Sequence, residues 1–497
     1  MYLKKALRGT LIVFMISLLG GLFGYLTRIV LARNLSVAEF GLFYSVVTIF
    51  LFITYFVDAG LGQAVARKII ELTIKKRTPL INDLIMNIMS FQLSVSLIIG
   101  VLLVVFSKYL SQYYFHANAS SLIIIFAIWL VSMPILSSFV YTIYGYQRSE
   151  IFAFIDMLKY FLIMLFSIVG ILLGFGFAAP AYAYLIAQFV LIIIAYLFAK
   201  RLRKISFKFK VNKALTVETI KFGMFILFTN LAWFLITQLD TMAVTYFTNP
   251  VQVAIYQIAV PISGLILYIT SSISLVVYPL ATELYSKKGY KQLIAGLELI
   301  YTYLIIVILP ITIMMYAFPD IIINILFTSK YTAAAPVLRI LSISAIFFSI
   351  CMINTAVLTA IGKPHKIARI MIGIAVLNLL LNIMLVPRYG IIGAAYATLA
   401  SFIVGTIISI IYARKEIAFS FPYYAWGMLT LISIGMIFFI NWLRGIILLT
   451  IIPKLIVIAA ITAIVYAALL LVLRIIKFQD ILFFTKLILK KDQEKVN

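Results

Sequence analysis

The sequence predicts an all-α integral membrane protein with about 14 transmembrane helices, and three features carry this prediction. Of the 497 residues, 65% are hydrophobic and only 11% are charged, with a mean hydropathy of +1.17, which lies outside the usage of soluble domains. Apolar runs of about 20 residues, long enough to cross a hydrocarbon core of roughly 30 Å, recur along the whole chain. Because backbone polar groups in lipid must satisfy one another, each run is expected to be a helix.

The expected helices form two sets of six and a final pair. The first set covers 9–31, 39–60, 84–107, 120–143, 152–174 and 180–199. The second set covers 219–243, 253–282, 293–317, 338–361, 368–386 and 391–413, and the final pair covers 424–442 and 452–474. Because the number of spans is even, both termini are expected on one side of the membrane.

The distribution of basic residues predicts which side that is. The net charge of +25, from 40 Lys and Arg, would also fit nucleic-acid binding. With both termini in the cytoplasm, however, 31 basic residues lie on the cytoplasmic side. The positive-inside rule therefore explains the charge without nucleic acid, and we expect a multi-pass protein of the cell membrane with cytoplasmic termini. The outer side and its span ends hold eight basic residues: Arg28, Arg33, Lys108, Lys330, Arg339, Arg388, Arg444 and Lys454.

Two pairs of segments indicate an internal repeat. SVAEFGLFY at 36–44 aligns with NPVQVAIYQ at 249–257, a shift of 213 that pairs Gly41 with Ala254. FGFAAPAYAYLIAQF from Phe175 aligns with YGIIGAAYATLASF from Tyr389 at a shift of 214. Because each unit holds six spans, both copies start from the same side, so the repeat is parallel.

The repeat predicts the domain organisation. An N-terminal six-helix lobe covers 1–199 and a C-terminal six-helix lobe covers 219–415, joined by a basic cytoplasmic linker at 200–218. The extra helix pair lies in 416–474 and a basic cytoplasmic tail in 475–497. We interpret the linker as a topology anchor that contacts anionic lipid, with docking to a partner enzyme as the alternative. The tail alternates apolar and basic residues, as an interfacial helix does.

TRIVLARNLSVAEFGLFYS at 27–45 and DAGLG at 58–62 resemble the start of the Wzx-type polysaccharide flippases. This family belongs to the superfamily that also holds the MATE drug exporters. QLDTMAVTYF at 238–247, the GKP turn at 362–364 and YGIIGAAYATLAS at 389–401 resemble the family's second half. The resemblance implies two lobes around a cavity open alternately to each side. It also implies a cargo of oligosaccharide linked to a polyprenyl or dolichyl pyrophosphate.

Three other functions stay open beside the flippase. A cation-coupled small-molecule exporter of the MATE type needs a carboxylate cluster, and the first span holds no acid, although Asp58 and Asp240 leave a coupling site open. A membrane glycosyltransferase is disfavoured, because His116 and His365, the two histidines, lie on opposite sides of the predicted topology. We therefore expect no catalytic residue, metal or cofactor. A non-transporting scaffold is the third alternative, and charges within spans argue against it.

Charged residues within spans are the candidate binding residues, because an anionic pyrophosphate needs a cationic path through the membrane. Arg28 lies near the outer end of the first span and Arg33 just beyond it. An arginine can fork two N–H donors onto one phosphate. Snorkelling to the interface is the stronger interpretation for Arg33, whereas for Arg28 snorkelling and cargo contact are balanced.

The repeat also relates Arg28 to a second charge. The repeat shift of 213 residues pairs Thr27 with Asp240 and Arg28 with Thr241. We hypothesise that Arg28 and Asp240 pair when the outer side closes, and that cargo phosphate competes for Arg28.

Three further charged residues complete the candidate set. Asp156 and Lys159 lie three residues apart in one span, so they share a helix face and can neutralise each other. Lys159 lies on the order of 10 Å deep, where a cavity lining or an internal pair is the default. Asp58, at an inner span end, is expected as a cap or as a binding residue. We expect lipid-linked sugar and membrane lipids as partners, polysaccharide-synthesis enzymes as candidate partners, and a monomer.

Overall fold

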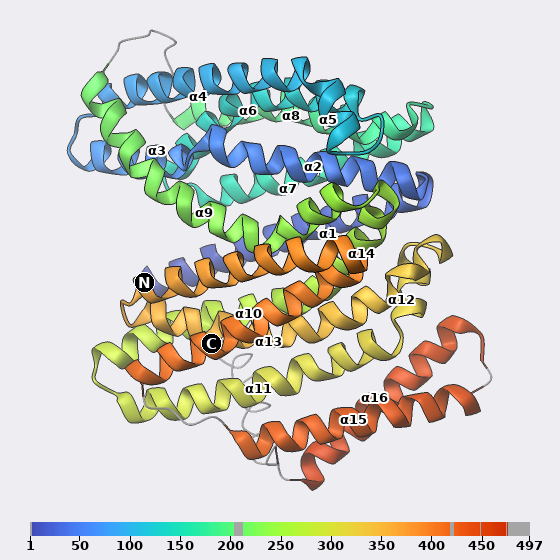
Figure 1. Ribbon diagram of the computed structural model, residues 1–497. Helices are drawn as coiled ribbons and strands as arrows, with labels where there is room; N and C mark the ends of the chain where they lie inside the picture. The colour runs from blue at the N-terminus through green and yellow to red at the C-terminus, as the bar shows by residue number, and fades with distance from the viewer. Residues whose placement is uncertain (1, 203–211, 418–421, 448, 474, 476–497) are drawn as a thin grey trace, which may run out of the picture. The chain divides into compact units, whose positions relative to one another are not determined.

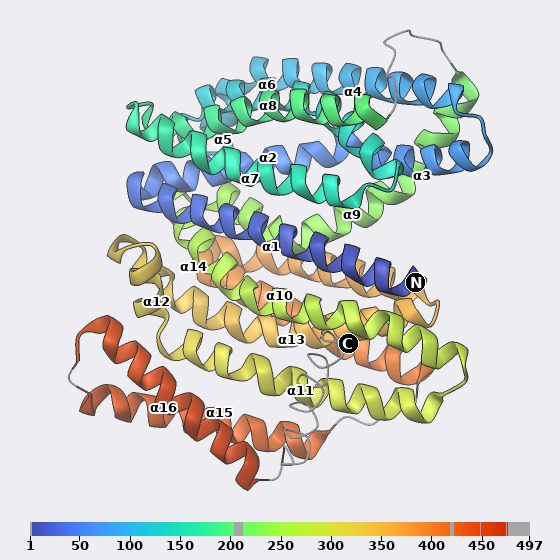
Figure 2. The same cartoon turned by 180° about the vertical axis from the view of Figure 1, so that it is seen from behind.

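A computed structural model of the protein describes residues 2–202, 212–417, 422–447, 449–473 and 475, and every regular element among them is helical (Figures 1 and 2). Thirteen helical segments of this described part are long and apolar enough to cross a membrane. One of them, α14 (Pro364–Glu416), contains both predicted spans 368–386 and 391–413. The predicted fold class is therefore confirmed. Most of the predicted linker and nearly all of the predicted tail lie outside the described residues.

Helix packing divides the chain into two compact units. Unit 1 comprises Met1–Pro261, Leu326–Ala333 and Met371–Ala397. Its first helices are α1 (Tyr2–Asn34), α2 (Val37–Asp58), α3 (Leu61–Ile74), α4 (Pro79–Val105), α5 (Ser107–Tyr113) and α6 (Ser120–Gly145). It continues with α7 (Ser149–Leu172), η1 (Gly176–Ala178), α8 (Ala179–Leu202), α9 (Lys213–Phe247), the start of α10 (Pro250–Ser286) and the middle of α14.

Unit 2 comprises Ile262–Ile325, Ala334–Ile370 and Thr398–Asn497. It contains the rest of α10 and of α14, with α11 (Tyr290–Ala317), most of α12 (Pro319–Leu326), α13 (Ala335–Ala360), α15 (Tyr423–Ile446) and α16 (Ile451–Val472). Helix α11 packs against both α13 and α15, and α15 packs against α16. The final helix pair is thus attached to unit 2 through α11. The units follow packing rather than the sequence repeat, so the six-helix lobes stay a prediction.

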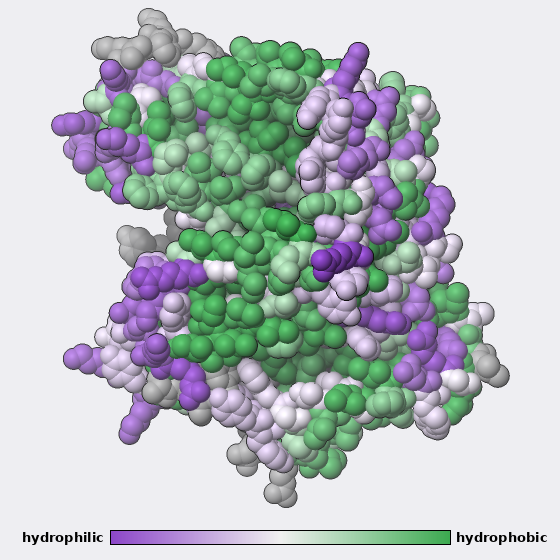
Figure 3. Space-filling view, in the orientation of Figure 1, coloured by the Kyte–Doolittle hydropathy of each residue, from purple (hydrophilic) through white to green (hydrophobic). Residues whose placement is uncertain are grey.

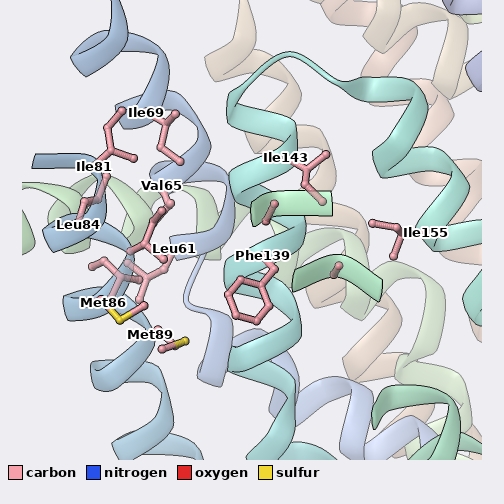
Figure 4. Packing of buried hydrophobic residues seen from close by; sticks show 14 of the residues in the cluster. Leu61, Val65, Ile69, Ile81, Leu84, Met86, Met89, Phe139, Ile143 and Ile155 are labelled. Carbon is pink, nitrogen blue, oxygen red and sulfur yellow. The ribbon is translucent and has the colours of Figure 1, made fainter. Parts of the chain in front are cut away.

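The surface and the core of the units follow the expected polarity. In each unit, hydrophobic residues cover the middle of the helices and hydrophilic residues gather toward the helix ends (Figure 3). A cluster of buried hydrophobic residues in unit 1 lies among α3, α4, α6, α7 and α8, and includes Leu61, Ile81, Phe139 and Ile155 (Figure 4). Because lipid is as apolar as these side chains, close packing rather than exclusion of water holds such helices together.

Two backbone breaks set the helix boundaries of unit 1. Ala59 and Gly60 both adopt left-handed conformations, with φ of 48° and 69°, so α2 turns sharply into α3. A Cβ atom at Gly60 would lie 2.4 Å from the carbonyl oxygen of Gly223 in α9, which fixes α9 against this turn. Gly390 breaks α14 with φ of 57° and ψ of −137°, a conformation that glycine adopts without steric cost.

Helices α2 and α10 approach each other closely at Gly41. A Cβ atom there would lie 1.7 Å from the carbonyl oxygen of Pro250 and 2.9 Å from the backbone nitrogen of Ala254. Ala254 is the residue that the sequence repeat pairs with Gly41. Contact between equivalent positions is the arrangement expected at a two-fold axis, so this observation supports the repeat.

Replacing Gly41 with alanine is expected to destabilise unit 1. The added methyl group has no room against Pro250, and overpacking of this kind costs roughly 1–3 kcal/mol. Gly21→Ala is the matched control, because a Cβ atom at this second helical glycine meets nothing within 4 Å. Thermal unfolding of the purified proteins should show a lower midpoint for Gly41→Ala alone. Equal midpoints for the two variants would contradict the close approach.

Candidate functional site

Arg28 is held inside unit 1 by contacts from two other helices. Its Nη1 donates to the backbone oxygen of Gln257 at 2.6 Å and to the side-chain Oε1 of the same residue at 2.8 Å. Its guanidinium lies over the ring of Tyr44, 4.2 Å from the centroid, which is a cation–π contact. Arg28 of α1 therefore contacts both α2, through Tyr44, and α10, through Gln257.

The two residues that hold Arg28 are themselves equivalent in the repeat. The shift of 213 that pairs Gly41 with Ala254 pairs Tyr44 with Gln257. The Nε2 of Gln257 donates to the Oγ1 of Thr241 at 2.9 Å, and Thr241 is the repeat equivalent of Arg28. One amide side chain thus links a residue of the first repeat to its counterpart in the second.

Asp240 lies next to Thr241 in α9 and forms the centre of a buried polar cluster. Its carboxylate accepts hydrogen bonds from Tyr256 at 2.9 Å, from Asn378 at 3.0 Å and from Asn382 at 2.7 Å. Asp240 is 7% exposed and the other three are 2% exposed or less. The cluster therefore joins α9, α10 and α14 within unit 1.

The predicted relation between Arg28 and Asp240 takes an indirect form. Gln257 accepts from Arg28 and donates to Thr241, so a chain of hydrogen bonds through Gln257 leads from Arg28 to the residue next to Asp240. The two oxygens of Gln257 that accept from Arg28 are neutral amide oxygens. A direct pair in another state of the protein stays a prediction.

The Asp240 cluster offers oxygen atoms of the kind that hard cations bind. Carboxylate and amide oxygens are preferred ligands of such ions, and the Oδ1 of Asn382 is buried without a hydrogen-bond partner. In the described part of the chain, no group of three or more His, Cys, Asp or Glu side chains could hold a metal ion. The cluster itself brings one carboxylate and two amide side chains together.

Lys159 and Asp156 form the ion pair that their spacing predicts. The Nζ of Lys159 lies 2.5 Å from the Oδ1 of Asp156, with side-chain exposures of 36% and 51%, and Lys159 also lies 4.4 Å from the ring centroid of Tyr160. Lys159 thus lies between a carboxylate and an aromatic ring.

Arg33 and Asp58 make contacts that are structural in kind. The Nε of Arg33 donates to the backbone oxygen of Leu326 at 3.2 Å, at an exposed position. The Oδ1 of Asp58 accepts from the backbone N–H of Gly62 at 3.2 Å and from Gln92 at 3.3 Å. Asp58 thus caps the first turn of α3. A binding role for either residue stays a prediction.

Sequence reasoning found the charges of this site but missed the neutral residues around them. Gln257 and Tyr44 could have been found by applying the repeat shift to the residues that follow Gly41. Asn378 and Asn382 lie four residues apart, so they share one helix face, and this spacing could have marked them as partners of a buried charge. Both patterns, the repeat shift and the four-residue spacing, point to a site only after a charged residue nearby has been identified.

Two family models match the chain, one described as "Polysaccharide biosynthesis protein" over residues 6–285 and one described as "MatE" over residues 226–384. The chain is 29% identical over 450 residues to an uncharacterized membrane protein of Methanocaldococcus jannaschii, covering 87% of this chain and 89% of that protein. It is 28% identical over 211 residues to the probable low-salt glycan biosynthesis flippase Agl15 of Haloferax volcanii, covering 42% and 45%.

Two solved structures share the fold. The lipid II flippase MurJ in an inward closed conformation matches with a TM-score of 0.73 at 15% identity, covering 92% of this chain and 98% of that chain. A multidrug resistance MATE family transporter in an inward-facing conformation matches with a TM-score of 0.61 at 20% identity, covering 82% and 98%. These similarities confirm the predicted MATE-like fold.

Replacing Asp240 with alanine is expected to destabilise the protein more than replacing Asp156. Asp240→Ala removes three buried hydrogen bonds to a carboxylate, each worth roughly 1.5–3 kcal/mol, whereas Asp156→Ala breaks a half-exposed pair worth roughly 0–1 kcal/mol. Thermal unfolding in detergent measures both effects. A larger loss for Asp156→Ala would show that the buried cluster does not stabilise unit 1.

Proposed function

The chain belongs to the polysaccharide biosynthesis protein family, because that family's model matches residues 6–285 of its 497, and from this premise we propose that it is a flippase for lipid-linked oligosaccharide. The cargo is an oligosaccharide on a polyprenyl or dolichyl pyrophosphate, and it crosses the membrane by alternating access. The matched relative named as a probable glycan biosynthesis flippase supports this proposal. The step supplied by the protein is transport, without a catalytic residue.

The observation that carries the proposal is the way in which Arg28 is held. A cation within a span is rarely lipid-facing and marks a substrate path or an internal pair. Arg28 has neutral acceptors in Gln257 and a ring face in Tyr44, so its charge is not neutralised by these contacts. It is therefore positioned to attract an anion.

A pyrophosphate would compete well for this arginine. Hydrogen bonds between a guanidinium and a phosphate are roughly twice as strong as those to a neutral acceptor. Both bonds to Gln257 use Nη1 alone, and the guanidinium has further N–H groups on Nη2 and Nε. Gln257 also donates to Thr241, so cargo binding at Arg28 would change the partners of a side chain that joins α10 to α9.

The predicted topology and the repeat also indicate the orientation and the oligomeric state of the proposed flippase. We propose that both termini are cytoplasmic, because this orientation places 31 of the 40 basic residues on the inside. A monomer is sufficient, since one chain carries both copies of the repeat. Enzymes of polysaccharide synthesis would supply the cargo on the cytoplasmic side.

A cation-coupled exporter of the MATE type is the second candidate. The MatE family model matches residues 226–384, a range that includes Asp240 and Asn382, and the buried oxygens of this cluster suit a coupling cation. The candidate differs from the first in its cargo, which would be a small molecule without a lipid anchor. A transport assay therefore separates the two functions.

Loss of Arg28 is expected to abolish translocation. In liposomes that hold the purified protein and a fluorescent polyprenyl pyrophosphate oligosaccharide, exposure of the sugar at the outer leaflet should fall at least tenfold for Arg28→Ala, and Arg28→Lys should restore part of the rate. Lys108→Ala is the matched control, and it should stay within about twofold of the wild type, because Lys108 is also basic, lies on the predicted outer side and is exposed. Wild-type rates for Arg28→Ala and Asp240→Ala would refute the role of this site. Efflux of small cations without sugar translocation would favour the exporter.

The Lys159–Asp156 pair gives a separate test of the cationic path. If Lys159 contacts cargo, Lys159→Met should slow translocation several-fold, whereas Asp156→Asn should not slow it because it leaves the cation in place. The same liposome assay measures both variants. Equal losses in the two single variants, with no further loss in the double variant, would assign the pair a structural role.

A further inference from the structure

Four charged side chains gather at one end of the unit 2 helices. Arg339 lies near the start of α13, Arg444 in the last turn of α15 and Lys454 in the first turn of α16. Asp320 lies in the first turn of α12. Figures 1 and 2 both show α12 and the connection from α15 to α16 at the same end of unit 2. The proposed topology places this end on the outer side of the membrane.

Arg444 connects the final helix pair to the end of α11. Its Nη1 donates to the backbone oxygen of Ala317 at 2.8 Å, and its Nη2 lies 3.4 Å from the Oδ2 of Asp320. Its guanidinium lies 4.9 Å from the ring centroid of Phe318. The Nζ of Lys454 donates to the backbone oxygen of Arg444 at 2.7 Å. These contacts fix both cations at the end of the helices.

Arg339 is oriented toward the same carboxylate. Its Nε donates to the backbone oxygen of Tyr316 at 3.2 Å, and its Nη2 lies 4.0 Å from the Oδ1 of Asp320. The side-chain exposures are 43% for Arg339, 29% for Arg444 and 38% for Asp320. The cluster is therefore open to the surroundings at the level of the helix ends.

The charges of this cluster do not balance. Two arginines share one carboxylate, and Lys454 adds a third cation through its contact with Arg444. Three of the eight basic residues on the predicted outer side therefore lie here. Arg339 and Lys454 also lie within the first five residues of their helices, where the positive end of the helix dipole disfavours a cation. Holding α15 and α16 against α11 requires only the hydrogen bonds to the carbonyl oxygens and the ion pairs with Asp320. The additional positive charge is better explained by a bound anion.

The cluster also has donors to spare. Two arginines and a lysine carry roughly thirteen N–H groups in all, and the contacts described above occupy few of them. Helix ends lie at the level of the lipid headgroups, where the available anion is a lipid phosphate. We propose that Arg339, Arg444 and Lys454 bind the phosphate group of an anionic membrane lipid and thereby secure α15 and α16 against α11. This site is independent of the flippase proposal.

The test is lipid-dependent thermal stability of the purified full-length protein in non-ionic detergent. Phosphatidylglycerol should raise the wild-type unfolding midpoint in a saturable way, whereas phosphatidylcholine should not. Arg339→Gln removes one cation but leaves the Arg444 contacts, and it should raise the half-saturating phosphatidylglycerol concentration at least tenfold. Arg148→Gln is the matched control, because Arg148 is also exposed and lies 3.8 Å from a single acid, Glu150, in unit 1. It should behave as the wild type.

Three other results would contradict the proposal or its choice of lipid. An unchanged half-saturating concentration for Arg339→Gln, or an equal effect of phosphatidylcholine, would overturn it. Inorganic phosphate that gives the full wild-type stabilisation would overturn the lipid as the source of the phosphate group. If Arg339→Gln does not fold, Lys454→Gln takes its place, with the same tenfold change expected.

Discussion

The hydrogen-bond chain from Arg28 through Gln257 to Thr241 is the interaction on which the centre of unit 1 depends. A guanidinium within a membrane span must find acceptors inside the protein, because hydrocarbon offers none. Gln257 supplies two acceptor oxygens, and its amide nitrogen donates a further hydrogen bond to Thr241 of α9. Helices α1, α9 and α10 are therefore joined by one polar side chain. The close approach of α2 to α10 at Gly41 brings Tyr44 against the same guanidinium. Small residues that let backbones approach are the usual means of packing helices in lipid.

This arrangement separates the positive charge of the site from its negative charge. Arg28 is held by an amide and an aromatic ring, while Asp240 is held by a tyrosine and two asparagines. The contacts of Arg28 are with neutral groups, so an anion can bind this guanidinium without first breaking a strong ion pair. An anionic cargo at Arg28 and a cation at Asp240 would act on adjacent residues of α9 and α10. The two ligands would be coupled if each changes the affinity of the protein for the other, and the bond between Gln257 and Thr241 is a contact that both could affect.

The sequence alone predicted the long helices well, because an apolar run of about 20 residues has few other stable forms in lipid. It did not predict α3, α5 or α12, which are 14, 7 and 8 residues long and too short for a span. For the site, charge within an apolar run identified Arg28 and Asp240. Gln257 was missed because neutral polar residues occur in any span, and its role depends on the fold that brings α10 beside α1. The direct Arg28–Asp240 pair was inferred from the repeat, which fixes equivalent positions but not side-chain partners.

Binding as a function of cargo charge tests the central claim most directly. Equilibrium affinity would be measured in nanodiscs for one oligosaccharide carried on a polyprenyl pyrophosphate, on a polyprenyl monophosphate and on a phosphate-free polyprenol. If Arg28 recognises the pyrophosphate, affinity should fall at each step, by roughly tenfold or more in total, since a charge-assisted bond is worth about 1.5–3 kcal/mol. Equal affinity for the three carriers would contradict the account, and would show that the glycan or the isoprenoid chain is recognised instead.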